Sequence, residues 1–208
     1  PVVIPPLRQP SGKLWEDAAV ASMLTHNDAG STASCVAFIA MLWDLLGMSE
    51  PPPSTWWLER YLEVASQLEG ETTYKPRGGR WEGQYADSLH GFVRVAVGWA
   101  EREGIDTVEA CNAFHSGAYL LETMPCVILL LTRYGHDPQE AIVRAVNDTK
   151  DNDTIAAIVG AAVGALHGRA GLDEDWIDNL TGRTTRDDDG RVFELLEQAC
   201  ERFGTASG

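Results

Sequence analysis

The most regular feature of the sequence is a set of apolar positions that recur every three or four residues. Such a period predicts amphipathic helices, because one face of an α-helix returns every 3.6 residues. The clearest example is residues 31–46, which place Cys35, Phe38 and Leu42 on one side. No segment alternates polar and apolar residues in the manner of a β-strand, and no βαβ rhythm is present. The sequence therefore predicts an all-α fold.

The breaks between periodic segments divide the chain into a series of helices. Apart from the acidic stretch considered below, they are expected at residues 14–24, 31–46, 54–68, 84–103, 107–115, 125–134, 138–146, 173–180 and 192–203. Residues 1–13 contain four prolines and are expected to form an extended lead-in. Pro125 suits the first turn of its helix, where a missing backbone N–H costs nothing. Residues 69–83 are expected to form a long surface loop.

Length and composition predict a single domain over residues 1–208 and argue against some classes of partner. A formal net charge of -15 argues against nucleic acid or an anionic membrane as the main partner. The longest apolar run, residues 155–166, is too short to span a bilayer. The four cysteines are scattered among apolar neighbours without a Cys-x-x-Cys pair, which indicates buried reduced thiols in a cytoplasmic protein.

The chemically most informative stretch is residues 147–168. Its first part crowds Asp148, Asp151 and Asp153 into six residues, and its second part is rich in Ala, Gly and β-branched residues. One aspartate is explained by capping of the helix that follows. Three carboxylates repel one another and favour a bound cation, and in a first helical turn Asp151 and Thr154 share a face that Asp153 can reach. Aspartate and threonine oxygens suit Mg²⁺ or Mn²⁺. Capping and metal binding both remain open at this point.

The second part of this stretch has Gly160, Gly164 and Gly168 at every fourth position. Glycine inside a helix costs about 1 kcal/mol relative to alanine. We therefore expect neighbouring backbones to approach closely at these glycines, and we expect this helix to be a central one.

Three weaker motifs have simple structural explanations as well as functional ones. Thr25-His26-Asn27-Asp28 is a polar break in which Asn27 or Asp28 can cap the next helix, and a lone His in such a place is commonly structural. Ser116-Gly117-Ala118-Tyr119 can be a simple turn. The loop near residue 75 is either a solvated connection or a surface facing an anionic ligand; it gathers Tyr74, Lys75, Arg77, Arg80 and Trp81.

Residues 147–168 closely resemble the C-terminal signature of the ADP-ribosylglycohydrolase family, in the form seen in dinitrogenase reductase-activating glycohydrolases. Other segments are similar to family elements in the same order. Residues 25–28 resemble the Thr-His element, residues 116–123 the segment before the last long helices, and residues 176–183 the closing segment. The similarity therefore spans most of the chain.

The resemblance implies an orthogonal multi-helix bundle around a two-metal centre that holds Mg²⁺ or Mn²⁺. It also implies hydrolysis of the glycosidic bond that joins ADP-ribose to a protein side chain, often arginine, with an ADP-ribosylated protein or ADP-ribose as the partner. The metal ligands carried over by position are Asp151, Asp153 and Thr154. The catalytic residues are Asp151 and His26, with His26 near the ribose that bears the scissile bond. The substrate-binding residues are His26, Ser116, Gly117 and Tyr119.

The sequence departs from the family pattern at its N-terminal side. The family's Gly-Asp loop and Thr-Asp-Asp cluster, which supply the remaining metal ligands, are not found here, and Pro1 falls where that section would end. We therefore expect the C-terminal portion of a longer enzyme, with half of the ligands supplied by another segment. The alternative is a non-catalytic ADP-ribose-binding or crystallin-like member of the same fold. A helical scaffold whose aspartates only cap is the remaining alternative.

Overall fold

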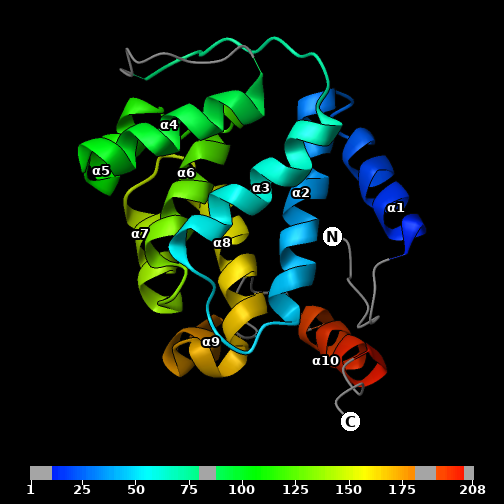
Figure 1. Cartoon of the computed structure of the whole chain (residues 1–208). Coiled ribbons are helices and arrows are strands. Elements are labelled where there is room, and N and C mark those ends of the chain that lie inside the picture. The colour runs from blue at the N-terminus through cyan, green and yellow to red at the C-terminus, as the bar shows by residue number, and fades with distance from the viewer. Residues whose placement is uncertain (1–10, 80–87, 181–190, 204–208) are drawn as a thin grey trace.

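The structure is a computed structural model that describes residues 11–79, 88–180 and 191–203. Every regular element in these ranges is helical, which confirms the all-α prediction. The helices are α1 (Gly12–Met23), α2 (Ala29–Leu46), α3 (Ser54–Leu68), α4 (Leu89–Glu103), α5 (Thr107–Ala113), α6 (Leu120–Tyr134), α7 (Pro138–Asn147), α8 (Asn152–His167), the 3₁₀ turn η1 (Arg169–Gly171), α9 (Glu174–Leu180) and α10 (Arg191–Phe203). Figure 1 shows α4 crossing one end of the bundle, whereas α2, α7 and α8 run steeply down the view, so the packing is orthogonal.

The most completely buried helix of the bundle is α6, whereas α8, which the glycine spacing predicted to be a central helix, packs against α2, α6 and α7. Residues 121–132 of α6 are buried without interruption. This helix packs against α3, α4, α5, α7 and α8 (Figure 1). A helical segment that is apolar on all sides must be enclosed on all sides, and the long apolar side chains at residues 127–131 of α6 are fully buried.

The prediction of close backbone packing around α8 was wrong. A Cβ built on Gly160 or Gly164 meets no atom within 4 Å, and Ala157 and Ala161 are exposed. The buried face of α8 consists of Ile155, Val159, Ala162 and Val163. Alanine and glycine carry so little apolar surface that exposing them costs little, so their spacing does not by itself indicate burial.

Alanine at these two open positions is expected to stabilise the protein. Gly160→Ala and Gly164→Ala should each raise the unfolding free energy by about 1 kcal/mol, since alanine restricts the unfolded chain and is the better helix former. Urea unfolding followed by circular dichroism measures the change. Gly135→Ala is the control, because its Cβ would lie 2.5 Å from Cζ2 of Trp57 and should destabilise the protein. A loss of stability in Gly160→Ala would contradict the finding that a Cβ at this position meets no neighbouring atom.

Several helix boundaries differ from the sequence prediction, and two of the differences have clear local reasons. Ser11 caps α1 by accepting a hydrogen bond from the backbone N–H of Leu14 at 3.3 Å, so the helix begins inside the expected lead-in, at Gly12. Helix α6 begins at Leu120, which places Pro125 inside the helix and not in its first turn. The predicted cap at Asp28 is confirmed, since its carboxylate accepts from the N–H of Ser31 at 2.9 Å.

The cysteines of the described residues agree with the predicted reduced thiols. Cys111 and Cys126 are buried, Cys35 is half-buried, and all three are free. Burial raises the pKa of the Cys126 thiol well above its ordinary value. The Cys126 thiol is therefore protonated at neutral pH, as is usual for a packing residue.

Helix α2 is long and apolar enough to cross a membrane by length and composition alone. However, 56% of this 18-residue helix is buried inside the bundle, and the core helix of a soluble protein meets the same criteria. The composition of α2 is therefore weak evidence for a membrane.

Candidate functional site

A strained turn between α5 and α6 meets the acidic segment that precedes α8. His115 and Ser116 have positive φ angles of 77° and 42°, which is unusual for residues other than glycine. The turn is held by the acidic segment: Lys150 donates its backbone N–H to Oγ of Ser116 at 3.1 Å, and Asp151 donates its N–H to the Ser116 carbonyl at 2.9 Å. The structure thus joins Ser116 and Asp151, which lie 35 residues apart in the sequence.

Two carboxylates of the acidic segment have a buried oxygen that accepts no hydrogen bond. Asp148 is the C-cap residue of α7, and its side chain is 5% exposed. Its Oδ2 lies 3.7 Å from Nη1 of Arg144, with which it forms an ion pair. Burial raises the pKa of Asp148 even though the charge of Arg144 acts in the opposite direction. Asp151 occupies the N-cap position of α8, but its side chain makes no capping bond. Oδ2 of Asp148 and Oδ2 of Asp151 are both buried and accept no hydrogen bond, but within the described residues only Oδ2 of Asp148 has an ion-pair partner, Arg144.

Capping therefore does not account for the Asp151 side chain, and an orphaned carboxylate oxygen suits a cation. Asp153 and Thr154 are exposed in the first turn of α8, next to Asp151 in the chain. Their oxygens are the donor type that Mg²⁺ and Mn²⁺ prefer, so the residues present fit such an ion. Within the described ranges, however, no three Asp, Glu, His or Cys side chains converge on a metal position. The metal-ligand roles of Asp151, Asp153 and Thr154 stay predictions.

A second group of contacts links the Thr25–Asp28 break to the turn before α6. The hydroxyl of Tyr74 donates to the Asp28 carboxylate, and the Tyr74 ring lies 6.3 Å from the ring of Tyr119. Burial would raise the pKa of Asp28, but hydrogen bonds from Ser31 and Tyr74 outweigh it and lower that pKa. Two of the predicted elements are thus bridged by the loop near residue 75.

This loop is not simply the solvated connection that the sequence allowed. Gly79 has a φ of 91°, and a Cβ there would lie 2.1 Å from the Ala113 carbonyl, so the loop backbone lies directly on the end of α5. Arg77 lies over the ring of Tyr119, with Cζ 4.1 Å from the centroid. Arg80 and Trp81 lie outside the described residues.

The predicted substrate-binding residues are only partly brought together. Ser116 is buried, Gly117 is half-buried, and Tyr119 is the N-cap residue of α6. His26 is exposed, and its Nδ1 lies 3.0 Å from Oγ1 of Thr25 in the same break. No contact in the described part of the chain joins His26 to the turn, so its role also stays a prediction.

Sequence reasoning gave no role to Glu122, a buried carboxylate in the first turn of α6. Its side chain is 5% exposed, and both oxygens lie 3.5 Å from Arg77 nitrogens. A Cβ on Gly117 would lie 2.4 Å from Oε2 of Glu122, so the turn lies directly on this carboxylate. The sequence did contain a signal for this residue, because Glu122 is the single acidic residue of a long apolar helix. Charges in such places are usually paired.

The fold is an orthogonal helical bundle, and its interhelical segments gather buried carboxylates around a strained turn, as in a helical protein with an acidic active centre. The family model described as ADP-ribosylglycohydrolase matches residues 1–206. The chain belongs to the ADP-ribosylglycohydrolase family, which confirms the resemblance over nearly the whole chain. No curated protein and no solved structure matches the chain. Hydrolysis of glycosidic bonds to ADP-ribose is the general activity that this membership supports.

Proposed function

We propose that this chain acts in the metal-dependent removal of ADP-ribose from a modified arginine side chain. The observation that carries the proposal is the buried Oδ2 of Asp151, which accepts no hydrogen bond although Asp151 lies beside the Ser116 turn. Such an oxygen is costly unless a proton or a cation satisfies it. Membership of the family supports the choice of a glycosidic bond to ADP-ribose as the target.

Each residue has a defined role in this proposal. Mg²⁺ or Mn²⁺, held by Asp151, Asp153 and Thr154, would supply an activated water and orient the ribose hydroxyls. Asp148 orients this segment through its contact with Arg144. The backbone of the Ser116 turn is kept rigid by its bonds to Lys150 and Asp151.

The remaining roles concern the bound ADP-ribose. Cleavage at the anomeric carbon develops positive charge on the ribose, and a fixed position of that ring lowers the barrier. Tyr119 and Gly117 lie at the turn where ADP-ribose would bind, and His26 would contact the ribose that bears the scissile bond. A second set of metal ligands from another segment would complete the centre.

The test is release of ADP-ribose from an ADP-ribosylated arginine protein. We expect release by the 208-residue chain together with a segment that supplies the second set of ligands, in the presence of Mg²⁺ or Mn²⁺, and loss of at least about 100-fold in rate when EDTA removes the metal. The 208-residue chain alone is assayed in parallel. Absence of release in both assays under both metals would refute the proposal.

The second candidate is a protein that binds ADP-ribose without cleaving it. It is favoured by the absence of three converging metal-binding side chains within the described ranges. Isothermal calorimetry separates the two candidates, since binding of ADP-ribose at micromolar concentration without turnover would favour this one. Binding of neither metal nor ADP-ribose would instead indicate a structural role.

A further inference from the structure

The contact between Arg77, Tyr119 and Glu122 has the chemistry of a guanidinium-binding site. The Arg77 guanidinium lies 4.1 Å from the Tyr119 ring centroid, and its Nε and Nη2 each lie 3.5 Å from an oxygen of Glu122. An aromatic face and a carboxylate are the two groups that recognise this planar cation, through stacking and paired N–H donors. The binding groups belong to α6, whereas the cation comes from a separate loop.

A small apolar pocket lies beside this contact and borders the Glu122 carboxylate. It opens between the loop, at Pro76 and Gly78, and a wall formed by Phe92, Phe114 and Leu121. Among the described residues that line it, Glu122 is the only one that carries a charge. A buried carboxylate at the edge of an apolar pocket requires a positive partner.

The arginine of this contact is open to exchange with another cation. The Arg77 side chain is 60% exposed, so its guanidinium can rotate into water without movement of the loop backbone. Water competes for the exposed guanidinium but cannot satisfy the buried Glu122 carboxylate, so exchange requires that another cation takes the place of Arg77. Glu122, by contrast, is held in the first turn of α6 against Gly117 and cannot follow the arginine out.

The position of this contact relates it to the candidate centre. Gly117 lies directly on the Glu122 carboxylate, and the preceding residue, Ser116, is bonded to Asp151. A group bound at Tyr119 and Glu122 is therefore separated from the acidic segment by one turn of backbone.

We propose that Tyr119 and Glu122 form a subsite for the arginine side chain that carries ADP-ribose, and that Arg77 occupies this subsite until the substrate replaces it. The proposal rests on the proposed function for the identity of the ligand, but binding of a guanidinium can be measured without any hydrolysis. Arg77 then acts as an internal competitor that lowers the apparent affinity for the substrate arginine.

The experiment is an NMR titration of the 208-residue chain with agmatine, a small guanidinium compound. We expect Arg77→Ala to bind agmatine about five- to ten-fold more tightly than the wild type, because the competing cation is gone. Adding Glu122→Gln to Arg77→Ala should weaken binding at least about ten-fold, and adding Tyr119→Leu, which keeps the carboxylate, should weaken it about three-fold. Circular dichroism confirms that each variant is folded.

Lys75→Ala is the matched control, since it removes a positive charge from the same loop. It should leave agmatine affinity within about two-fold of the wild type, because its exposed charge is screened. An unchanged affinity in Arg77→Ala, or an equal gain in Lys75→Ala, would overturn the subsite. Agmatine binding with these mutational effects but no ADP-ribose release would instead refute the proposed function alone.

Discussion

Replacing Asp151 with alanine is expected to lower the rate of ADP-ribose release at least about 100-fold without lowering stability. The side chain makes no capping bond, and its buried Oδ2 accepts none, so its removal costs the apo protein no interaction. In the metal-bound protein it removes a proposed ligand. We expect Mg²⁺ or Mn²⁺ to raise the melting temperature of the wild type and not that of Asp151→Ala. The assay is ADP-ribose release, and thermal unfolding with and without metal measures stability.

The matched control is Asp137→Ala at the start of α7. Asp137 also occupies an N-cap position, but its carboxylate accepts a hydrogen bond from the N–H of Glu140 at 3.0 Å. This variant should lose about 1 kcal/mol of unfolding free energy and keep its activity. We therefore expect Asp151→Ala to lose activity but not stability, and Asp137→Ala to lose stability but not activity. A destabilised Asp151→Ala that retains its metal response would show that Asp151 is a structural cap.

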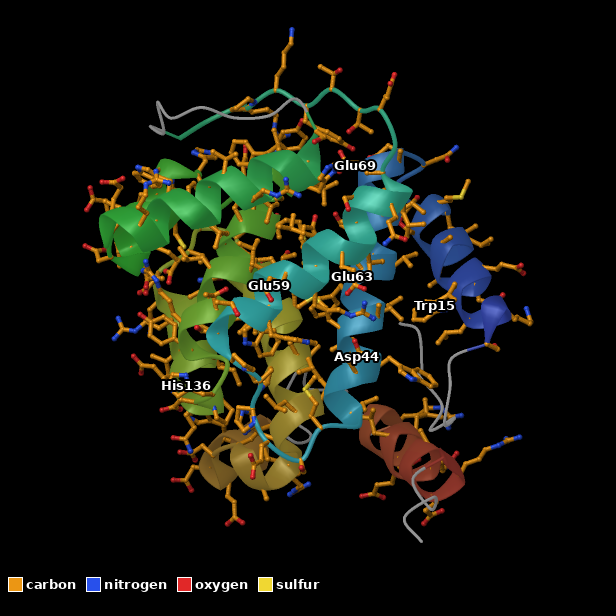
Figure 2. The ribbon with its side chains drawn as sticks, viewed as in Figure 1. Trp15, Asp44, Glu59, Glu63, Glu69 and His136 are labelled. Atoms are coloured by element: carbon orange, nitrogen blue, oxygen red, sulfur yellow. The ribbon has the colours of Figure 1, made fainter. Side chains whose placement is uncertain are left out.

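The second large effect concerns Glu69, which connects α3 to α4 at the top of the view in Figure 2. Its carboxylate is 1% exposed and accepts four hydrogen bonds. The donors are the N–H of Leu89 at 2.6 Å, the N–H of His90 at 2.9 Å, Nδ1 of His90 at 2.6 Å, and the hydroxyl of Thr72. Ser88 satisfies the next N–H, that of Gly91, at 3.2 Å. The orphan donors of the first turn of α4 are thereby satisfied from outside the helix.

Glu69→Ala is expected to lower the unfolding free energy by about 3 kcal/mol, because it leaves several buried donors without an acceptor. Chemical denaturation measures this loss. Ser88→Ala, which removes one bond from the same helix start, should cost about 1 kcal/mol. Equal losses in the two variants would contradict the central role of Glu69.

The same carboxylate should make stability depend on acid pH. Burial by itself would raise the pKa of Glu69, but the hydrogen bonds from Thr72, His90 and Leu89 outweigh it, and that pKa is lowered. A carboxyl group with a lowered folded-state pKa stabilises the fold above its unfolded pKa of about 4.3 and loses this contribution as pH falls through the folded value. The stability difference between wild type and Glu69→Gln should therefore shrink on acidification below about pH 4. A difference that stays constant would contradict the lowered pKa.

Local sequence signals predicted the parts of the structure that depend on neighbours along the chain. The helical period placed α2 and α3, and the polar break at residues 25–28 predicted the cap at Asp28. The acidic stretch before α8 was identified as the candidate centre, and the resemblance that it carried was confirmed by the family match. Period and capping act within one turn of helix, so they can be read without knowledge of the fold.

Only the tertiary structure decided which surfaces each helix buries and which distant charges meet. The glycine spacing predicted close backbone packing around α8, yet the most completely buried helix is α6, because its long apolar side chains bury far more surface than Gly160 and Gly164 can. Residues 69–83 read as a surface loop, yet Glu69 is buried under α4 and Arg77 reaches Glu122. These contacts join residues 20 or more positions apart, and a period of 3.6 residues carries no information about such pairs. The residue types at the candidate centre were therefore determined by the sequence alone, whereas their partners depend on how the helices pack.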